Sequence, residues 1–237
     1  MTLQLAMFGS DGVVLASDTL RCFMGKLRAS ENAQKIVIES VLGLAYASSG
    51  DDCAREIGSN LTARLTPGET LSNGLLLDVG NQTLSRFARK TNSKKRNLRG
   101  KLIIVQSRGK VGIKYDVGFG VWTLEYSQGK VLPSGVPRTQ GKGHAWAGDE
   151  ANSAQFFIEW YYRGMSLMPV ESLKKMAAHT ILMGGKLNPT GVEGLQIVSC
   201  KDGVFTEVEE KERASLEVLS VGLDNYICQQ FGCEKPE

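Results

Sequence analysis

The stretch MTLQLAMFGSDGVVLASD, residues 1–18, contains two short apolar runs on either side of a turn and ends in an acidic residue. Residues 3–8 and 12–17 are mostly apolar, and the segment GSDG at 9–12 has the Gly and Asp residues of a tight turn. The pattern predicts a β-hairpin. Asp18 directly follows the second predicted strand, where a buried chain rarely carries a charge.

Thr2 stands directly behind the initiator methionine. If Met1 is removed, Thr2 becomes the chain terminus and carries a hydroxyl nucleophile together with a free α-amine, which can serve as its base. We expect no propeptide before Thr2. We therefore expect activation to need only Met1 removal, with assembly left open as a second requirement.

A second hairpin is predicted from KIVIES, which opens at Lys35, and from LGLAYASSG, which follows Ser40 and Val41. The continuous apolar character of this hairpin favours a strand that is covered on both faces. Residues 19–34, between the two hairpins, are polar and are predicted to be irregular.

Helical spacing follows the SGDD segment at 49–52, whose acidic residues suit the first turn of a helix. Pro67 and Gly68 end that helix, and a second is predicted from Glu69 to about Thr91. Four strand-like runs come next: LIIVQS, VGIKYDV, GVWTLEYS and the segment that ends with HAWAG.

Helical spacing returns around 154–161 and again from Pro169. Gly184 and Gly185 are predicted to form the C-cap of the helix that starts at Pro169. A strand pair, GLQIVSC and GVFTEV, and a helix over about 209–231 complete the chain. Because strands and helices are grouped, the order predicts antiparallel sheets covered by helical layers. No linker divides the chain, so one domain over 1–237 is expected.

Composition gives no general sign of a nucleic-acid or membrane partner. The net charge is +3, from 28 basic and 25 acidic residues, and the hydrophobic content is 42%. No run approaches the roughly 20 apolar residues of a membrane span, and the N-terminus lacks a secretion signal. Five cysteines without a CxxC pair indicate reduced thiols and a cytoplasmic protein. They are Cys22, Cys53, Cys200, Cys228 and Cys233.

Three further features are given their plainest interpretation. The basic segment 94–101 is predicted to be a solvated loop, because no aromatic residue is interleaved with it. His144 and His179 have no second ligand at metal spacing, so both are interpreted as structural, and neither a metal nor a cofactor is expected. An aromatic cluster is interpreted as core plus a subunit interface. It consists of Phe156, Phe157, Trp160, Tyr161 and Tyr162.

The segment GSDGVVLASDTLR resembles the opening of proteasome subunits, in which an Asp-Gly turn precedes an apolar strand ending in Ala-x-Asp-Thr/Ser-Arg. KIVIES and LGLAYASSGDDCARE resemble the second hairpin and first helix of that family, and ANSAQFFIE and EGLQIVSCKDGV its third helix and last hairpin. The resemblance covers nearly the whole chain. It implies an α+β fold, the four-layer αββα sandwich of N-terminal-nucleophile (Ntn) hydrolases, built from two antiparallel sheets.

In catalytic proteasome subunits the nucleophile is a terminal Thr, an Asp ends the second strand and a Lys begins the third. The resemblance places Thr2 and Asp18 on the first two positions without a gap. It places Lys35 on the third if the loop between Arg21 and Asn32 is one residue longer here. Taken singly, Thr2 is a common second residue, Asp18 could serve as a turn residue and Lys35 could be a solvated strand end.

The resemblance also implies a substrate site. The backbone N–H of Ser48 would be the oxyanion donor, and substrate would lie extended between Cys22 and the edge formed by Ser48 and Ser49. The family carries Gly where this chain has Ser48, and a side chain there narrows the site.

Outer positions depart further from the family pattern. An accessory Ser that precedes the third helix is matched by Asp149, and a family Asp and Ser are matched by Asn188 and Gly191. Thr190 could supply a nearby hydroxyl. These changes leave open lower activity, a different chemistry or no activity.

The first hypothesis is a catalytic β-type subunit or a bacterial-type or ancestral proteasome homologue, that is, a threonine-type peptidase or amide hydrolase in a self-assembled ring or related multimer. It would act on peptide or protein, with an ATPase regulator left open. The second is a non-catalytic scaffold or ring subunit. The α-type subunits carry a helix before the first strand, for which this chain has no room, and that counts against an α role. The third is an Ntn amidase or transpeptidase with a specialised or non-protein substrate.

Overall fold

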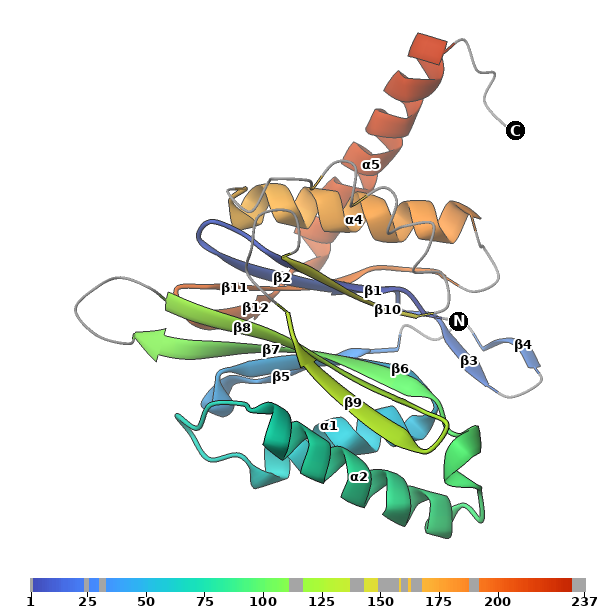
Figure 1. Ribbon diagram of the computed structural model, residues 1–237. Helices are drawn as coiled ribbons and strands as arrows, with labels where there is room; N and C mark the ends of the chain where they lie inside the picture. Colours follow the sequence, from blue (N-terminus) through green and yellow to red (C-terminus); the bar gives the residue numbers. More distant parts are fainter. Residues whose placement is uncertain are drawn as a thin grey trace.

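The structure is a computed structural model in which two antiparallel sheets are stacked face to face between two helical layers (Figure 1). This arrangement confirms the αββα sandwich that the sequence predicted. In the part of the chain that the structure describes, no helix is long and apolar enough to span a membrane. The described part comprises residues 2–23, 26–29, 33–110, 117–136, 143–148, 158, 162, 168–187 and 192–231.

The first sheet has the strand order β10-β1-β2-β11-β12. Its centre is the predicted first hairpin, closed by a 2.7 Å bond from the Gly9 N–H to the Gly12 carbonyl. Since side chains alternate along a strand, Leu3 and Leu5 face the α4 layer while Ala6 and Phe8 face the second sheet. The strands are β1 (Gln4–Phe8), β2 (Gly12–Ser17), β10 (His144–Ala147), β11 (Gln196–Lys201) and β12 (Val204–Glu207).

The second sheet has the strand order β5-β6-β7-β8-β9. The predicted second hairpin forms β5 and β6, and Leu44 to Ala47 of β6 are buried as its apolar pattern indicated. Its strands are β5 (Ile36–Glu39), β6 (Leu44–Gly50), β7 (Gly100–Lys110), β8 (Val117–Ser127) and β9 (Lys130–Gly135). A 3-10 turn, η1 (Ser40–Leu42), joins β5 to β6.

Helices α1 (Asp52–Arg64) and α2 (Asn73–Lys90) cover the second sheet, and α4 (Val170–Leu187) covers the first (Figure 1). Helix α5 (Glu210–Phe231) packs on α4 through contacts from Glu212 to Asp224, and the figure shows its C-terminal end projecting beyond α4. Three apolar clusters lie between successive layers. The sandwich is therefore held together by burial of apolar surface at every layer boundary.

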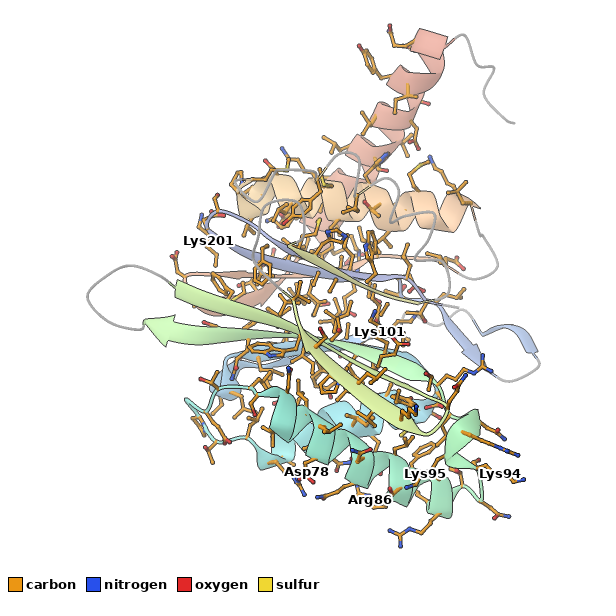
Figure 2. All side chains as sticks on the ribbon, viewed as in Figure 1. Asp78, Arg86, Lys94, Lys95, Lys101 and Lys201 are labelled. Atoms are coloured by element: carbon orange, nitrogen blue, oxygen red, sulfur yellow. The ribbon has the colours of Figure 1, made fainter. Side chains whose placement is uncertain are left out.

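Most of the basic segment 94–101 is exposed, as predicted. Lys94, Lys95, Arg96 and Arg99 are exposed, and Figure 2 shows Lys94 and Lys95 at the outer edge of the molecule, beside α2. The segment includes the 3-10 turn η2 (Lys95–Asn97). A solvated connecting loop is therefore correct for the basic residues at 94–99, but wrong for Lys101, which belongs to β7 and is half-buried.

Two strand predictions were wrong. Part of 19–34, predicted to be irregular, forms the small hairpin of β3 (Arg21–Phe23) and β4 (Lys26–Ala29). Strand β9 lies in a stretch to which no strand was assigned. It contains Pro133, which a strand tolerates at a sheet edge, and it is the edge strand of its sheet. The run VGIKYDV lies outside the described residues except for Val117, which begins β8.

Two helix predictions were also wrong in their limits. Helix α2 begins at Asn73 with Ser72 as its N-cap, and not at Glu69. Helix α4 continues through Gly184 and Gly185 to Leu187 instead of ending there. A Cβ on Gly184 would lie 2.4 Å from the Leu3 side chain, so this glycine serves close packing of the helix on β1.

Of the predicted helix around 154–161, only Ile158 is described, and it is helical and buried. Tyr162 is also buried, and its hydroxyl donates to the Phe8 carbonyl at 2.5 Å, which assigns it to the core. The other members of the aromatic cluster, Phe156, Phe157, Trp160 and Tyr161, lie outside the described residues.

Candidate active site

The predicted pair Thr2 and Asp18 is brought together by the first hairpin. Gln4 is paired with Ser17 in the β1–β2 register, so the residues just beyond them meet at the same end of the sheet. The Leu3 N–H donates to Asp18 Oδ1 at 2.8 Å, and the Asp18 N–H donates to the Leu3 carbonyl at 3.1 Å. The backbone beside Thr2 is thereby fixed to the carboxylate.

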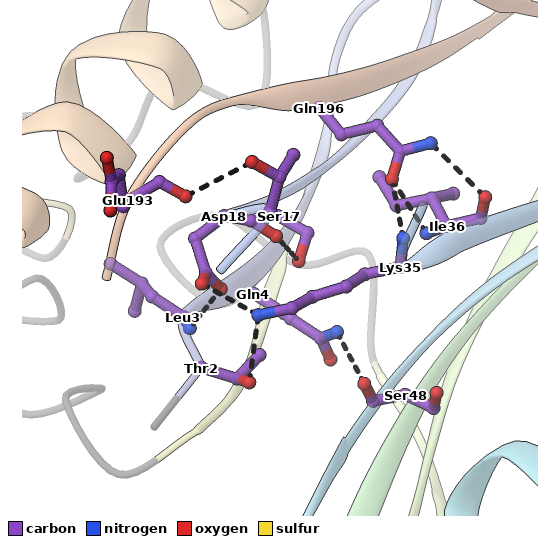
Figure 3. A network of polar contacts seen from close by, with 11 residues as sticks. Thr2, Leu3, Gln4, Ser17, Asp18, Lys35, Ile36, Ser48, Glu193 and Gln196 are labelled. Carbon is purple, nitrogen blue, oxygen red and sulfur yellow. Dashed lines mark hydrogen bonds and ion pairs between the residues drawn. The ribbon is translucent and has the colours of Figure 1, made fainter. Parts of the chain in front are cut away.

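Lys35 enters from the second sheet, immediately before β5. Its Nζ lies 2.7 Å from Asp18 Oδ2 and 3.0 Å from Thr2 Oγ1 (Figure 3). The Asp18 side chain is fully buried and that of Lys35 is 10% exposed. The structure thus places all three predicted residues in one contact network, with the lysine crossing from one sheet to the other.

Burial dominates the electrostatics of Asp18 and raises the pKa of its carboxyl above the ordinary value. The Lys35 ammonium and the backbone N–H groups of Leu3 and Leu20 oppose that shift. The carboxylate therefore depends on Lys35 for its charge balance, and it aims the ammonium at the Thr2 hydroxyl. Such a cation beside a hydroxyl favours the deprotonated, nucleophilic form of the oxygen.

Ser48 and Ser49 lie on β6 beside this network. The Ser48 carbonyl accepts a 2.9 Å hydrogen bond from Gln4 Nε2, and the Ser49 hydroxyl donates to the Lys101 carbonyl at 3.2 Å. Lys35 and both serines line a cleft of about 100 Å³. Its other lining residues are Leu20, Ala33, Gln34, Val37, Gly50, Asp51, Asp52 and Arg55.

The remaining predicted site residues are described in part or not at all. Cys22 belongs to β3, and its side chain lies outside the described residues. Asp149, Asn188, Thr190 and Gly191 all lie outside the described residues, as does Met1.

Gly148, whose role the sequence did not indicate, lies directly against Thr2. A Cβ at this position would be 1.5 Å from the Thr2 carbonyl oxygen, and the residue has φ of 115°, a conformation suited to glycine. The chain after β10 therefore closes on Thr2 only because no side chain is present. The sequence signal was the glycine itself, between a strand and an acidic residue.

Two buried glutamines, Gln4 and Gln196, were also missed. Both lie in the first sheet and bond to backbone groups of the second, at Ser48 and at the start of β5 respectively. Each is a polar residue within an otherwise buried strand, and that was the available signal.

Among the described residues, no three His, Cys, Asp or Glu side chains come together as metal ligands. The chemistry that the described groups can supply is that of an activated hydroxyl beside a paired cation. The cleft is lined by the end of β6 and by Lys35, whose ammonium contacts the Thr2 hydroxyl.

Comparison with known proteins gives a likeness of structure without a match of sequence. No protein-family model and no curated protein matches the chain. Anbu, an ancestral beta-subunit, from Yersinia bercovieri is 16% identical, with a TM-score of 0.69 over 99% of each chain. A mutant of Anbu from Hyphomicrobium sp. strain MC1 is 12% identical, with a TM-score of 0.68 over 100% of this chain and 99% of the other. These likenesses show that the chain shares the fold of the two Anbu proteins.

Proposed function

We propose that the chain is a threonine-type peptidase or amide hydrolase that uses Thr2 as its terminal nucleophile after Met1 is removed. The observation that carries this proposal is the position of Lys35 Nζ, 3.0 Å from Thr2 Oγ1 and 2.7 Å from Asp18 Oδ2. A buried ammonium in contact with both groups favours the deprotonated Thr2 hydroxyl, which is the form that would attack a substrate.

In the proposed reaction the Thr2 oxygen forms a bond to the substrate carbonyl carbon while its proton passes to the α-amine, directly or through water. The backbone N–H of Ser48 donates a hydrogen bond to the carbonyl oxygen and stabilises the negative charge that develops on it. The C–N bond then breaks as the proton passes to the leaving amine. Water attacks the resulting ester and releases the acid, and Thr2 regains its hydroxyl.

The proposed substrate is an extended peptide segment laid along β6 at Ser48 and Ser49. An ATPase that delivers unfolded protein is a further partner that this proposal allows. We place the activity in the cytoplasm, in keeping with Cys53 and Cys200, which are buried free thiols.

The test is hydrolysis of peptide and ester substrates, read together with the N-terminal mass of the purified protein. We expect loss of Met1 and a fall in rate of about a thousandfold or more in Thr2→Ala. Thr2→Ser should keep a measurable rate because it retains the hydroxyl. Thr206→Ala, at an exposed position on β12, is the matched control and should match the wild type. Equal rates for Thr2→Ala and the wild type, or Met1 retained in active protein, would rule out Thr2 as nucleophile.

We further propose that the chain works as a homo-oligomer, a ring or a related multimer, and that α5 pairs with α5 of a second copy. Leu216, Leu219, Leu223 and Tyr226 follow the alternating three- and four-residue spacing of paired helices. Leu216 is buried, whereas Leu219 is 46% and Tyr226 60% exposed. The exposed apolar residues of the helix are Val218, Leu219, Val221, Leu223, Tyr226 and Ile227.

The charge pattern of α5 supports the same partner. Over residues 218–231 Asp224 is the single charged residue, and it is paired with Lys186 of α4. A helix meant to face water normally carries a polar face. Six apolar side chains of α5 between Val218 and Ile227 are each at least 38% exposed, and a concentration of exposed apolar residues favours an interaction site.

Sedimentation velocity tests this interface. Leu219→Lys combined with Tyr226→Lys should shift the protein to smaller species, because both side chains are exposed in the monomer and would be covered in the pair. Val204→Lys, on a 65% exposed apolar residue of β12, is the control and should leave the mass unchanged. An unchanged mass in the α5 variant would exclude this helix as the interface.

A further inference from the structure

Gln196, the first residue of β11, links the two sheets at the strand that carries Lys35. Its Oε1 accepts hydrogen bonds from the backbone N–H groups of Lys35 and Ile36, each at 2.9 Å. Its Nε2 donates to the Ile36 carbonyl at 3.3 Å and to Glu207 Oε1 at 2.9 Å. The residue is 5% exposed, so these bonds form largely out of contact with water.

These contacts use the whole hydrogen-bonding capacity of a primary amide. The carbonyl oxygen of the side chain has two acceptor sites and the NH₂ group has two donors, and all four are engaged. A carboxylate at this position could accept the two N–H bonds but could not donate to Ile36 or Glu207. An apolar side chain would leave the N–H groups of Lys35 and Ile36 without this partner.

Gln196 also lies in register with the strand that presents Asp18. It is paired with Ser17 across β11 and β2, and Ser17 immediately precedes Asp18. The first sheet therefore holds Lys35 at two points. Asp18 binds the ammonium at the end of the side chain, and Gln196 binds the backbone from which that side chain starts.

Holding both ends matters because of the length and flexibility of lysine. Fixing the ammonium of a lysine side chain costs up to about 2 kcal/mol in lost rotamer entropy. The ion pair with Asp18 sets the distance of Nζ from the carboxylate, but a displacement of β5 could still carry Nζ away from the Thr2 hydroxyl. The bonds to Gln196 oppose that displacement, which is easier for β5 because it is, like β9, an edge strand of its sheet.

We propose that Gln196 is a positioning residue which holds the start of β5 so that Lys35 Nζ stays within reach of Thr2 Oγ1. This inference rests on the proposed function of Thr2. Gln196 does not line the substrate cleft, and its bonds to the backbone of Lys35 and Ile36 are its link to the site.

The chain provides a matched control in Gln106, a second buried glutamine that bonds to backbone groups across elements. Its Oε1 accepts from the Leu71 N–H at 2.9 Å, its Nε2 donates to the Glu69 carbonyl at 2.6 Å, and it is 3% exposed. It is paired with Leu44, at the end of β6 opposite Ser48. Loss of its amide should therefore disturb the fold to a similar degree without reaching the site.

The experiment compares Gln196→Met, Gln196→Glu and Gln106→Met in the processed full-length protein, with rates corrected for the folded fraction from urea unfolding. We expect Gln196→Met to lower kcat by about 10- to 100-fold, the effect of displacing a catalytic group by about 1 Å. KM should stay within about twofold of the wild type, because the proposed peptide contacts lie on β6, which Gln196 does not bind. Gln196→Glu should lose less, and Gln106→Met should keep the wild-type kcat.

Amide hydrogen exchange provides a reading that does not depend on activity. In Gln196→Met the amides of Lys35 and Ile36 should exchange faster, while those of Leu44 and Leu71 keep their wild-type rates. A wild-type kcat in Gln196→Met, or an equal fall in Gln106→Met, would overturn the positioning role while leaving the proposed function intact. Activity retained in Thr2→Ala would overturn both.

Discussion

Two polar seams join layers that are otherwise packed through apolar side chains, and they differ in how far their charges are buried. The site seam, Asp18, Lys35 and Gln196, lies between the sheets, where Asp18 is fully buried and the Lys35 side chain is 10% exposed. The helix seam joins α4 to α5. Its charged partners include Glu212 at 42% and Lys186 at 51% exposure. The helix seam consists of Lys174, His179, Lys186, Glu212, Ser220 and Asp224.

The difference shows what each seam is suited to do. A buried ion pair loses the hydration of both charges, so apolar side chains of the same volume would often serve stability better. Stability is thus a weak explanation of the site seam, whereas the proposed function gives the Lys35 ammonium a role beside Thr2. The helix seam keeps partial access to water and attaches one face of α5, which leaves its apolar residues available to a partner.

The largest expected effect is that of Lys35→Met in the site seam. It leaves the Asp18 carboxylate buried without its cation, which should cost about 3–5 kcal/mol of unfolding free energy at pH 7. Urea unfolding measures this loss. The loss should shrink as pH falls, because burial has raised the pKa of Asp18 and the neutral acid tolerates burial.

The double variant Asp18→Asn with Lys35→Met is the control for that experiment. It removes both charges and should recover a large part of the lost stability without recovering activity. If the double variant is no more stable than Lys35→Met, the buried charge is not the source of the loss.

A smaller effect is expected from Lys174→Met in the helix seam. Lys174 is buried, but its partners Glu171 and Glu212 are 65% and 42% exposed and can be hydrated again when the ammonium is lost. The cost should be about 1 kcal/mol by urea unfolding. A cost as large as that of Lys35→Met would show that the two seams are energetically alike.

The pH dependence of the helix seam should depend on His179. Burial lowers the pKa of this imidazole, opposed by Asp224 and reinforced by Lys186, and its Nδ1 lies 2.9 Å from Ser220 Oγ. Because the unfolded chain then binds the proton more readily, stability should fall as pH drops from the unfolded pKa towards the lower folded pKa.

His179→Gln tests this assignment by removing the titrating group while keeping a polar side chain. Its midpoint urea concentration should vary less than that of the wild type between pH 7.5 and about pH 5, a window that spans the ordinary pKa of histidine. An identical dependence of stability on pH in both proteins would show that His179 is not the titrating group.

The smallest effect is expected at the surface of the α1–α2 layer, where Arg64 and Asp78 are 42% and 54% exposed. Arg64→Ala should change the unfolding free energy by less than about 1 kcal/mol, because exposed ion pairs contribute little. This variant sets the baseline for the comparison. If Arg64→Ala cost more unfolding free energy than Lys174→Met, the exposure of an ion pair would not predict its contribution to stability.

Much of the fold could be predicted because it depends on local pattern. Alternation and turn residues predicted both hairpins, and pairing of Gln4 with Ser17 in the first one is enough to bring Thr2 beside Asp18. The resemblance to proteasome subunits supplied Lys35. The C-terminal limit of α4 was missed because it depends on the packing of Gly184 against Leu3. Strand β9 was missed because its proline is tolerated only at the edge of a sheet.

The missed site residues act over long separations in the chain. Gln196 is 161 residues from Lys35, and Gly148 follows a strand that pairs with β1 only in the folded sheet. Nothing in the residues around Gln196 indicates which backbone groups its amide will bind. Those hydrogen bonds form only when the two sheets pack together.

The sequence by itself determined the hairpins, the layered order of strands and helices, and the adjacency of Thr2 and Asp18, because these follow from side-chain periodicity and from pairing of neighbouring strands. Stacking of the two sheets decided the rest. It placed the Lys35 ammonium between Thr2 and Asp18, gave Gln196 its four partners and let Gly148 close on Thr2. The physical reason is that burial is collective: a charge or an amide can be held away from water only where distant parts of the chain supply its partners.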